Sequence, residues 1–312
     1  MTTQTKAKRQ IPNPLNAITS NPVALKELRG RMRGPRAFVV LTGYLAVVGI
    51  FTTVIYLMTT SASFNTTGQV NGGEVGRFLF SAVVAMELFL VTFITPAFTA
   101  SAISGEHERQ TYDLLRTTLL PEHSLVWGKM FSALAYIVLL LLAAIPLQSI
   151  AFLFGGVDLG ELYVSFVVLT ASATFLGSIG VYFSAITRRT LRANIMTYVT
   201  TMGVVILTSM VVMGAAEIAN SAFSNTGSLE KTEEWVLLLI RGLFVCLNPL
   251  TTLIVTQDFL INQQSVFTFE YTFQDSTTAT LPSPWLIFTL FYLIISVVIF
   301  MRTTRYLKQI DE

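Results

Sequence analysis

Few residues in this chain have the types needed for catalysis or metal binding, and their spacing argues against both. The chain contains two histidines, His107 and His123, and one cysteine, Cys246. His107 and the glutamate after it begin like the zinc-protease motif His-Glu-x-x-His, but Thr111 stands where the second histidine is required. We therefore expect both histidines to be surface residues and the chain to hold no metal.

Signatures of nucleotide binding and acyl transfer are missing as well. Gly128-Lys129 is followed by Met130 and lacks the earlier glycine of the phosphate loop Gly-x-x-x-x-Gly-Lys-Ser/Thr. The nucleophile motif Gly-x-Ser-x-Gly is also absent. We expect that this chain alone neither hydrolyses ATP nor binds a cofactor. Its basic clusters fit membrane topology and anionic lipid better than nucleic acid.

One acidic residue, Glu87, lies well inside an apolar run. A charge at that depth costs a few kcal/mol, so Glu87 should face the protein interior, a polar cavity or a partner. It follows Arg77 by ten residues, about 15 Å along a helix, so direct pairing of the two is not expected. Glu87 fits either an acid of a substrate pathway or subunit interface, or a snorkelling or protonated residue with a structural role.

The elements that carry these residues are predicted to be membrane helices. Hydrophobic residues make up 53% of the chain and charged residues only 12%, against roughly 25% charged in a typical soluble domain. Lipid must therefore solvate much of the surface, and in lipid only helices satisfy the backbone of such runs. Small residues in one run, Gly177, Gly180 and Ser184, predict close packing within the chain rather than a dimer seam. The six predicted spans are 38–58, 79–100, 126–154, 162–186, 195–215 and 285–301.

A seventh apolar segment, 235–256, is ambiguous because it contains Arg241, Asn248 and Pro249. Cytoplasmic loops collect Lys and Arg, so the placement of basic residues can decide between the topologies. With six spans and both termini inside, only three of the 20 basic residues lie outside. We therefore predict six spans, with residues 216–284 forming an outer-face region that dips back into the bilayer.

A short amphipathic basic helix is predicted before the first span. Asn21 suits its N-cap, Pro22 its first turn, and Gly34-Pro35 its end. Such a helix should lie in the headgroup layer, although a basic flank that only sets topology is the alternative. The predicted apolar face carries Leu25, Leu28 and Met32, and the basic face carries Lys26, Arg29 and Arg33.

The loop between the second and third spans predicts another short helix, over residues 106–116. Ser104 can cap it, and acids in the first turn with Arg116 near the end suit the helix dipole. Glu108, Tyr112 and Leu115 share one face, which suits docking into a groove on a soluble partner. A loop helix lying on the membrane surface is the alternative.

This loop resembles the permease subunits of type 2 ATP-binding-cassette (ABC) exporters. The resemblance rests on the pattern Gly105-Glu106-x-Glu108-Arg109-x-Thr111-x-Asp113-Leu114-Leu115, followed by Gly128-Lys129, and on the earlier Asn21-Pro22-x-x-x-Lys26-Glu27-Leu28-Arg29. It implies that residues 106–116 are the coupling helix that docks on the ATPase. The implied docking residues are Glu106, Glu108, Arg109, Tyr112, Asp113, Leu114, Leu115 and Arg116.

The resemblance also implies an organisation for the whole chain. Residues 1–37 would form the cytoplasmic N-terminus with its interfacial "elbow" helix, 38–301 an all-α six-span domain, and 302–312 a cytoplasmic tail. The coupling loop would occupy 101–125, and the outer-face re-entrant region 216–284 would precede the last span. The expected location is a bacterial plasma (inner) membrane.

The function implied is that of a permease subunit in an ATP-driven exporter. Its partners would be two copies of an ABC ATPase, which bind ATP and Mg²⁺, a second permease copy or a homologue, and membrane lipids. The substrate stays open among lipids, lipid-linked sugars, peptides, drugs and small ions. An ion-coupled secondary transporter and a membrane scaffold that recruits an ATPase are the alternatives.

Overall fold

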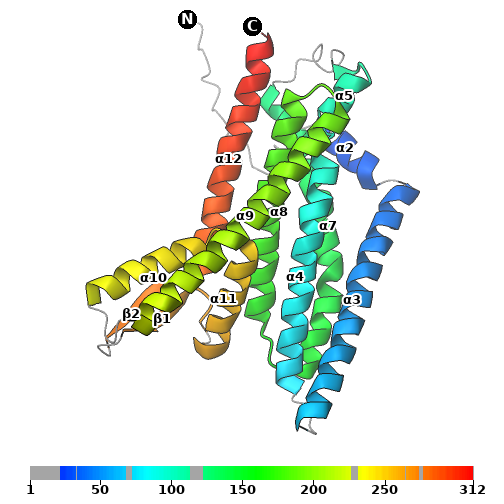
Figure 1. The fold of residues 1–312 in the computed structure, drawn as a ribbon. Coiled ribbons are helices and arrows are strands. Elements are labelled where there is room, and N and C mark those ends of the chain that lie inside the picture. The colour runs from blue at the N-terminus through cyan, green and yellow to red at the C-terminus, as the bar shows by residue number, and fades with distance from the viewer. Residues whose placement is uncertain are drawn as a thin grey trace, which may run out of the picture.

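The computed structural model describes residues 22–32, 34–67, 72–112, 122–225, 231–263, 265–273 and 277–311. Within these ranges six helices are long and apolar enough to cross a membrane, so the chain is an all-α multi-pass membrane protein, as predicted (Figure 1). Lipid supplies no partners for backbone amides, and a helix satisfies them internally. The six are α3 (Pro35–Thr67), α4 (Gly72–Thr99), α7 (Glu122–Phe154), α8 (Leu159–Ile186), α9 (Thr190–Asn225) and α12 (Pro284–Asp311).

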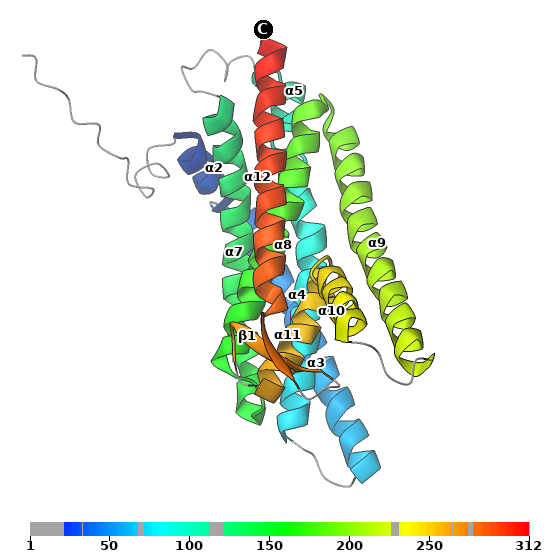
Figure 2. The same ribbon diagram turned by 90° about the vertical axis from the view of Figure 1, so that its left-hand side faces the viewer.

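Helix α8 is the centre of the bundle and α9 is its most exposed span. The most apolar window of α8 is 78% buried, whereas that of α9 is 11% buried. Helix α8 packs against α4, α7, α9 and α12, while α9 leans away from α12 (Figure 2). Most of α9 is therefore exposed to whatever surrounds the bundle.

Small residues let α8 approach α4 closely, as the sequence predicts. A Cβ atom on Gly180 would overlap the Thr99 side chain, and one on Gly177 would touch Thr95 at 3.4 Å. Farther along α8, the Ser184 hydroxyl accepts hydrogen bonds from the backbone N–H groups of Ile103 and of the next residue, at 2.8 and 3.0 Å. These small residues of α8 therefore serve packing inside the chain.

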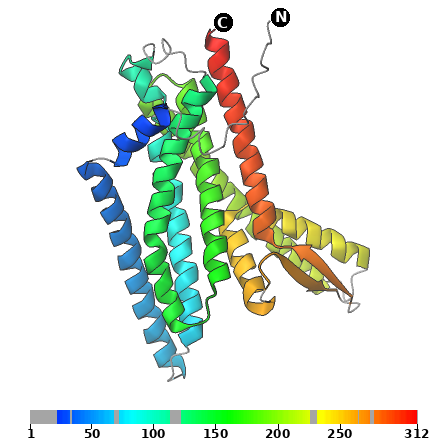
Figure 3. The same cartoon turned by 180° about the vertical axis from the view of Figure 1, so that it is seen from behind.

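The two ends of the bundle differ in what they carry. At one end, here called the α5 end, lie α2 (Pro22–Met32), α5 (Ser104–Glu108) and the last residues of α12 (Figures 1 and 3). Toward the opposite end, the hairpin end, lie α10 (Lys231–Val245), α11 (Pro249–Gln263) and a two-stranded hairpin. Helix α2 and the end of α12 thus lie at the same end, as an even number of crossings requires.

The ambiguous segment 235–256 is interrupted at Asn248-Pro249 and forms parts of two helices. The Asn248 side-chain oxygen accepts from the Leu250 N–H at 2.9 Å, which caps α11, and Pro249 begins that helix. Helices α10 and α11 have 15 residues each, too few to cross about 30 Å of hydrocarbon. The prediction of six spans therefore agrees with the fold, and the ambiguous segment is divided between two helices that are each too short to span.

The antiparallel hairpin of β1 (Thr268–Thr272) and β2 (Thr278–Pro282) was not predicted from the sequence. Its strands pair from Thr268 opposite Pro282 to Thr272 opposite Thr278. The Tyr271 hydroxyl donates to Glu234 at 3.2 Å, which ties the hairpin to α10. Residues 267–273 alternate aromatic and polar side chains, and Phe269 is buried between the exposed Thr268 and Glu270, so a strand signal was present that the all-helical prediction for residues 216–284 did not use.

Candidate functional site

A buried lysine at the α5 end joins three elements that are far apart in the sequence. The Lys129 side chain, on α7, is only 3% exposed. Its Nζ atom lies 3.2 Å from a Glu27 oxygen on α2 and 3.1 Å from a Glu106 oxygen on α5. We call these three residues the Lys129 junction. A buried ammonium group needs such partners, because an unpaired charge would carry a large desolvation cost.

A second cation, Arg31 on α2, completes the charge balance. Its Nε atom lies 3.9 Å from Glu27, its Nη2 donates to the Phe98 carbonyl oxygen at 3.2 Å, and its guanidinium stands 5.5 Å from the Phe98 ring centre. Burial lowers the pKa of Arg31 and the Glu27 charge opposes that effect, but an arginine stays charged at physiological pH. Two cations and two carboxylates therefore hold α2 against α4, α5 and α7.

The face of α2 that packs on the bundle differs from the predicted one. Ala24 is buried, and Glu27 and Arg31 point into the charge cluster. The predicted apolar face is only partly covered, since Leu25 and Leu28 are half-buried and Met32 is exposed. The predicted basic face is consistent with an interfacial helix where it is described: Lys26 and Arg29 are exposed, and Arg33 lies outside the described residues.

The loop helix is shorter than predicted. Helix α5 ends at Glu108, and Gln110 has a left-handed backbone with φ 57°, so no continuous helix runs through residues 106–112. Ser104 is not its N-cap: the preceding residue is, and the Ser104 hydroxyl donates to the Ala100 carbonyl oxygen. The predicted docking residues Asp113, Leu114, Leu115 and Arg116 lie outside the described residues.

Glu108 holds the start of α9. Its two carboxylate oxygens accept from the Thr190 backbone N–H at 2.8 Å and from the Thr190 hydroxyl at 2.7 Å. A carboxylate at a helix N-terminus satisfies an amide that has no partner inside the helix. Glu108 therefore connects the loop to the fifth span, a role that the sequence pattern did not suggest.

Tyr112 lies in the core and is not the exposed docking side chain that we expected. It is 7% exposed and its ring lies 4.0 Å from that of His107, centre to centre. Its hydrophobic cluster also contains Ile103, Leu125, Val126, Met130, Val181, Ala185 and Leu307. The exposed residues of this loop, among those described, are Glu108, Arg109, Gln110 and Thr111.

The loop is therefore attached to the bundle at several points. Glu106 binds α7 and, through Lys129, α2; Glu108 binds α9; Ser184 of α8 binds the turn before α5. We call the loop with these attachments the α5 bracket. The sequence analysis named Glu106, Glu108, Lys129 and Ser184 separately, but nothing in their local spacing marked them as parts of one set of contacts.

Glu87 faces the protein interior, as expected. It is completely buried, and its Oε2 accepts a hydrogen bond from Gln148 of α7 at 2.6 Å. Arg77 does not pair with it and instead donates to the Gly156 carbonyl oxygen at 2.8 Å. No basic side chain in the described residues lies within ion-pair distance of Glu87. Its partner is thus a neutral amide.

Neither metal ligands nor sequence comparisons assign a function. Among the described residues, no three His, Cys, Asp or Glu side chains gather in a way that could hold a metal ion. No family model and no curated protein sequence matches the chain. The geometry of the α5 bracket is therefore the strongest guide to function.

Proposed function

We propose that the chain is the transmembrane permease subunit of an ATP-driven exporter whose ATPase is a separate protein. The observation that carries the proposal is the α5 bracket, because one short loop is tied to α2, α7, α8 and α9 by specific side chains. A partner that displaced this loop would displace the ends of several spans together. The resemblance of the loop to the coupling segment of ABC exporters adds to the argument.

The charge distribution supports a cytoplasmic location for the α5 end. Basic residues in the described ranges gather there, whereas the hairpin end has only Arg77, Lys231 and Arg241. Positive residues are retained on the cytoplasmic side during insertion. The basic residues of the α5 end are Lys26, Arg29, Arg31, Arg36, Arg109, Lys129, Arg188, Arg189, Arg192, Arg302, Arg305 and Lys308.

In this proposal the ATPase subunits bind ATP and Mg²⁺ and act on the bracket. Two ATPase copies would serve two permeases, this chain and a second copy or a homologue, in a plasma membrane. Closure of the ATPases would push on the exposed loop around Arg109. Because Glu108 and the Lys129 junction link this loop to the spans, the push would tilt them.

The test is to purify the tagged protein in a gentle detergent and identify what accompanies it. We expect a stoichiometric phosphate-loop ATPase. Arg109→Glu should reduce its recovery at least about tenfold, because a like-charge contact at an interface costs several kcal/mol. Arg77→Glu is the matched control, an exposed arginine at the other end, and should leave recovery unchanged.

Absence of an ATPase from the eluate, in detergent and again in lipid nanodiscs, would contradict the proposal. Equal recovery of the ATPase with Arg109→Glu and with Arg77→Glu would show that Arg109 is not part of the docking surface. Transport of labelled candidate substrates in sealed vesicles separates an exporter from a scaffold that only recruits the ATPase.

An ion-coupled transporter is the second candidate, and Glu87 is the observation that favours it. A buried carboxyl whose partner is a neutral amide is a common feature of proton and cation pathways in membranes. If the protein were such a transporter, Glu87→Gln would abolish uptake driven by an ion gradient. An ATP-driven exporter with the same substitution would keep its ATPase and its ATP-dependent transport.

A further inference from the structure

A groove opens between three spans in the half of the bundle toward the α5 end. Helices α8, α9 and α12 enclose a volume of about 380 Å³. This size lies within the roughly 300–1,000 Å³ of ordinary ligand sites. The groove exists because α8 packs against both neighbours while α9 leans away from α12 (Figure 2). Its lining residues are Phe175, Ile179, Tyr182, Phe183, Thr200, Val298, Ile299 and Arg302.

The two ends of this groove differ in chemistry. Its walls are aromatic and aliphatic, and Arg302, an exposed residue near the end of α12, supplies the single charge of the lining. Arg188 and Arg189 follow in the connection between α8 and α9, Arg192 lies in the first turn of α9, and all three are exposed at the same end of the bundle. One acid also lies here, since Glu108 binds Thr190 and its charge is close to Arg189. Glu161 and Glu217 belong to the far ends of α8 and α9, and Asp311 is the last described residue of α12. The groove therefore combines an apolar interior with a cationic rim.

We propose that this groove binds a membrane lipid with an anionic phosphate headgroup, with an acyl chain between α8, α9 and α12 and the phosphate at Arg302. Arginine donates two parallel hydrogen bonds to phosphate oxygens, and basic pockets between membrane helices recognise anionic headgroups in this way. Binding of this lipid in the groove requires only that the chain is inserted in a membrane. The further possibility that the groove is the substrate site of an exporter, which would make the substrate a phosphorylated lipid, rests on the proposed function.

The floor of the groove limits how far the lipid enters. The Phe175 ring packs edge-on against Tyr292 of α12, with 4.6 Å between ring centres. Beyond it lies an enclosed space of about 10 Å³, next to Thr92, Ser172 and Pro249, which is enough for a single water. The Tyr292 hydroxyl donates to the Leu247 carbonyl oxygen at 2.8 Å, in the turn of the re-entrant region. Phe175 and Tyr292 thus separate the lipid groove from the outer-face elements.

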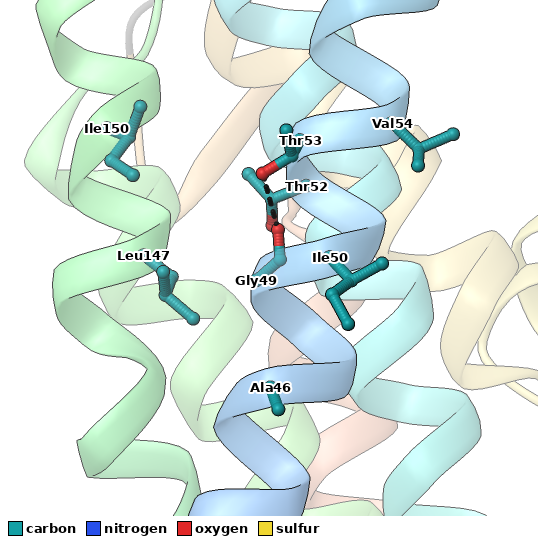
Figure 4. A pocket seen from close by; sticks show the side chains of 8 residues that line it. All are labelled: Ala46, Gly49, Ile50, Thr52, Thr53, Val54, Leu147 and Ile150. Carbon is teal, nitrogen blue, oxygen red and sulfur yellow. Dashed lines mark hydrogen bonds between the residues drawn. The ribbon is translucent and has the colours of Figure 1, made fainter.

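A second groove, between α3 and α7, serves as the comparison (Figure 4). It is larger, about 490 Å³, but no charged residue lines it. Its hydroxyls are used within α3, since Thr52 donates to the Val48 carbonyl oxygen at 2.7 Å and Thr53 to that of Gly49 at 2.8 Å. This groove accommodates hydrocarbon without selecting a headgroup. Its lining is Ala46, Gly49, Ile50, Thr52, Thr53, Val54, Leu147 and Ile150.

The test measures lipid retention by native mass spectrometry on the full purified chain, without an ATPase. Phosphatidic acid and phosphatidylcholine with identical acyl chains are offered in equal amounts. We expect preferential retention of one phosphatidic acid. Arg302→Gln should lower that retention about five- to tenfold, the effect of one basic residue near a headgroup. An excess of inorganic phosphate should not displace the lipid, which distinguishes a lipid site from a free-phosphate site.

A second pair of variants tests the groove itself. Thr200→Trp fills the α8–α9–α12 groove without changing charge and should also reduce retention, whereas Thr53→Trp fills the α3–α7 groove and should not. The control for Arg302 is Arg305→Gln, which removes the charge of an exposed arginine on the same helix that does not line the groove. Variants are compared only as monodisperse protein, so a folding failure does not count as loss of binding.

The proposal is overturned if the wild-type chain shows no preference for phosphatidic acid, or if Arg302→Gln and Thr200→Trp both retain it at the wild-type level. Its failure is distinguishable from failure of the exporter proposal. Selective lipid retention without any co-purifying ATPase would support the lipid groove and contradict the exporter proposal. A co-purifying ATPase without selective lipid retention would support the exporter proposal and contradict the lipid groove.

Discussion

At the α5 end of the bundle Lys129 joins three elements through ion pairs, while toward the hairpin end Asn248 joins two through neutral hydrogen bonds. Both side chains are buried, at 3% and 1% exposure. Lys129 reaches Glu27 and Glu106, whereas the Asn248 amide donates to the hydroxyls of Ser209 and Thr208 on α9 at 2.8 and 3.2 Å. The same task, holding separate elements together, is thus performed with different chemistry.

The two ends are expected to differ in how firmly their elements are held together. Removing one member of a buried charge cluster leaves the others without compensation, so such a cluster tolerates little separation. Removing a neutral hydrogen bond costs about 1 kcal/mol, and its groups find new partners more easily. We infer that the elements at the α5 end move as a unit, whereas those toward the hairpin end can shift relative to α9.

The largest effect is expected from Lys129→Met. It leaves Glu27 and Glu106 without their shared cation, and the protein should lose about 3 kcal/mol of stability, the lower end of the range for breaking a buried ion pair, since both carboxylates are partly exposed. Thermal unfolding in detergent measures the loss. Lys308→Met, an exposed lysine on α12, is the control.

Neutralising both partners sharpens this prediction. Adding Glu27→Gln and Glu106→Gln to Lys129→Met should restore part of the stability, because no uncompensated charge remains. If Lys129→Met melted like the wild type, the contrast between the two ends would fail.

A smaller effect is expected from Asn248→Leu. The substitution removes the cap of α11 and both hydrogen bonds to α9, for about 1–2 kcal/mol. Asn248→Ser keeps a neutral oxygen for the cap but loses the amide donors to α9, so it separates the two contributions. Melting temperatures of the three proteins give the comparison, and a loss for Asn248→Leu larger than that for Lys129→Met would reverse the proposed order of the two ends.

The smallest and most local effect is expected from Glu108→Gln. The amide retains one acceptor oxygen for Thr190 but loses the second, so amide hydrogens in the first turn of α9 should exchange faster while the melting temperature stays close to that of the wild type. Hydrogen–deuterium exchange of the peptide that begins at Thr190 measures the exchange rate of these amide hydrogens. Glu108→Ala, which removes both acceptors, should exchange faster still, and unchanged exchange in both variants would show that the contact does not hold α9.

The spans were predictable from the sequence because their cause is local. Lipid requires about 20 apolar residues in succession, and each such run forms a helix whatever its neighbours do. The interruption at Asn248-Pro249 was readable for the same reason, since a cap residue and a proline act on their own helix. The close approach at Gly177 and Gly180 was also indicated, although not the partner helix.

The candidate site was predictable only in part. The sequence singled out the loop after the second span and assigned its residues to a continuous docking helix. Tyr112 instead lies in the core, and Glu106 and Glu108 bind other parts of the chain. An exposed and an inward-facing charged residue look identical in sequence, because solvent and a buried partner both satisfy a charge.

The class of this protein, its six candidate spans and the break at Asn248-Pro249 could be derived from the sequence, since each follows from hydrophobicity and backbone chemistry within one segment. The contacts of Lys129 with Glu27, 102 residues away, and of Glu108 with Thr190, 82 residues away, became known from the tertiary structure alone. Such pairs depend on which helices become neighbours and how they are rotated. Those outcomes come from packing summed over the whole bundle and leave no mark in the local pattern.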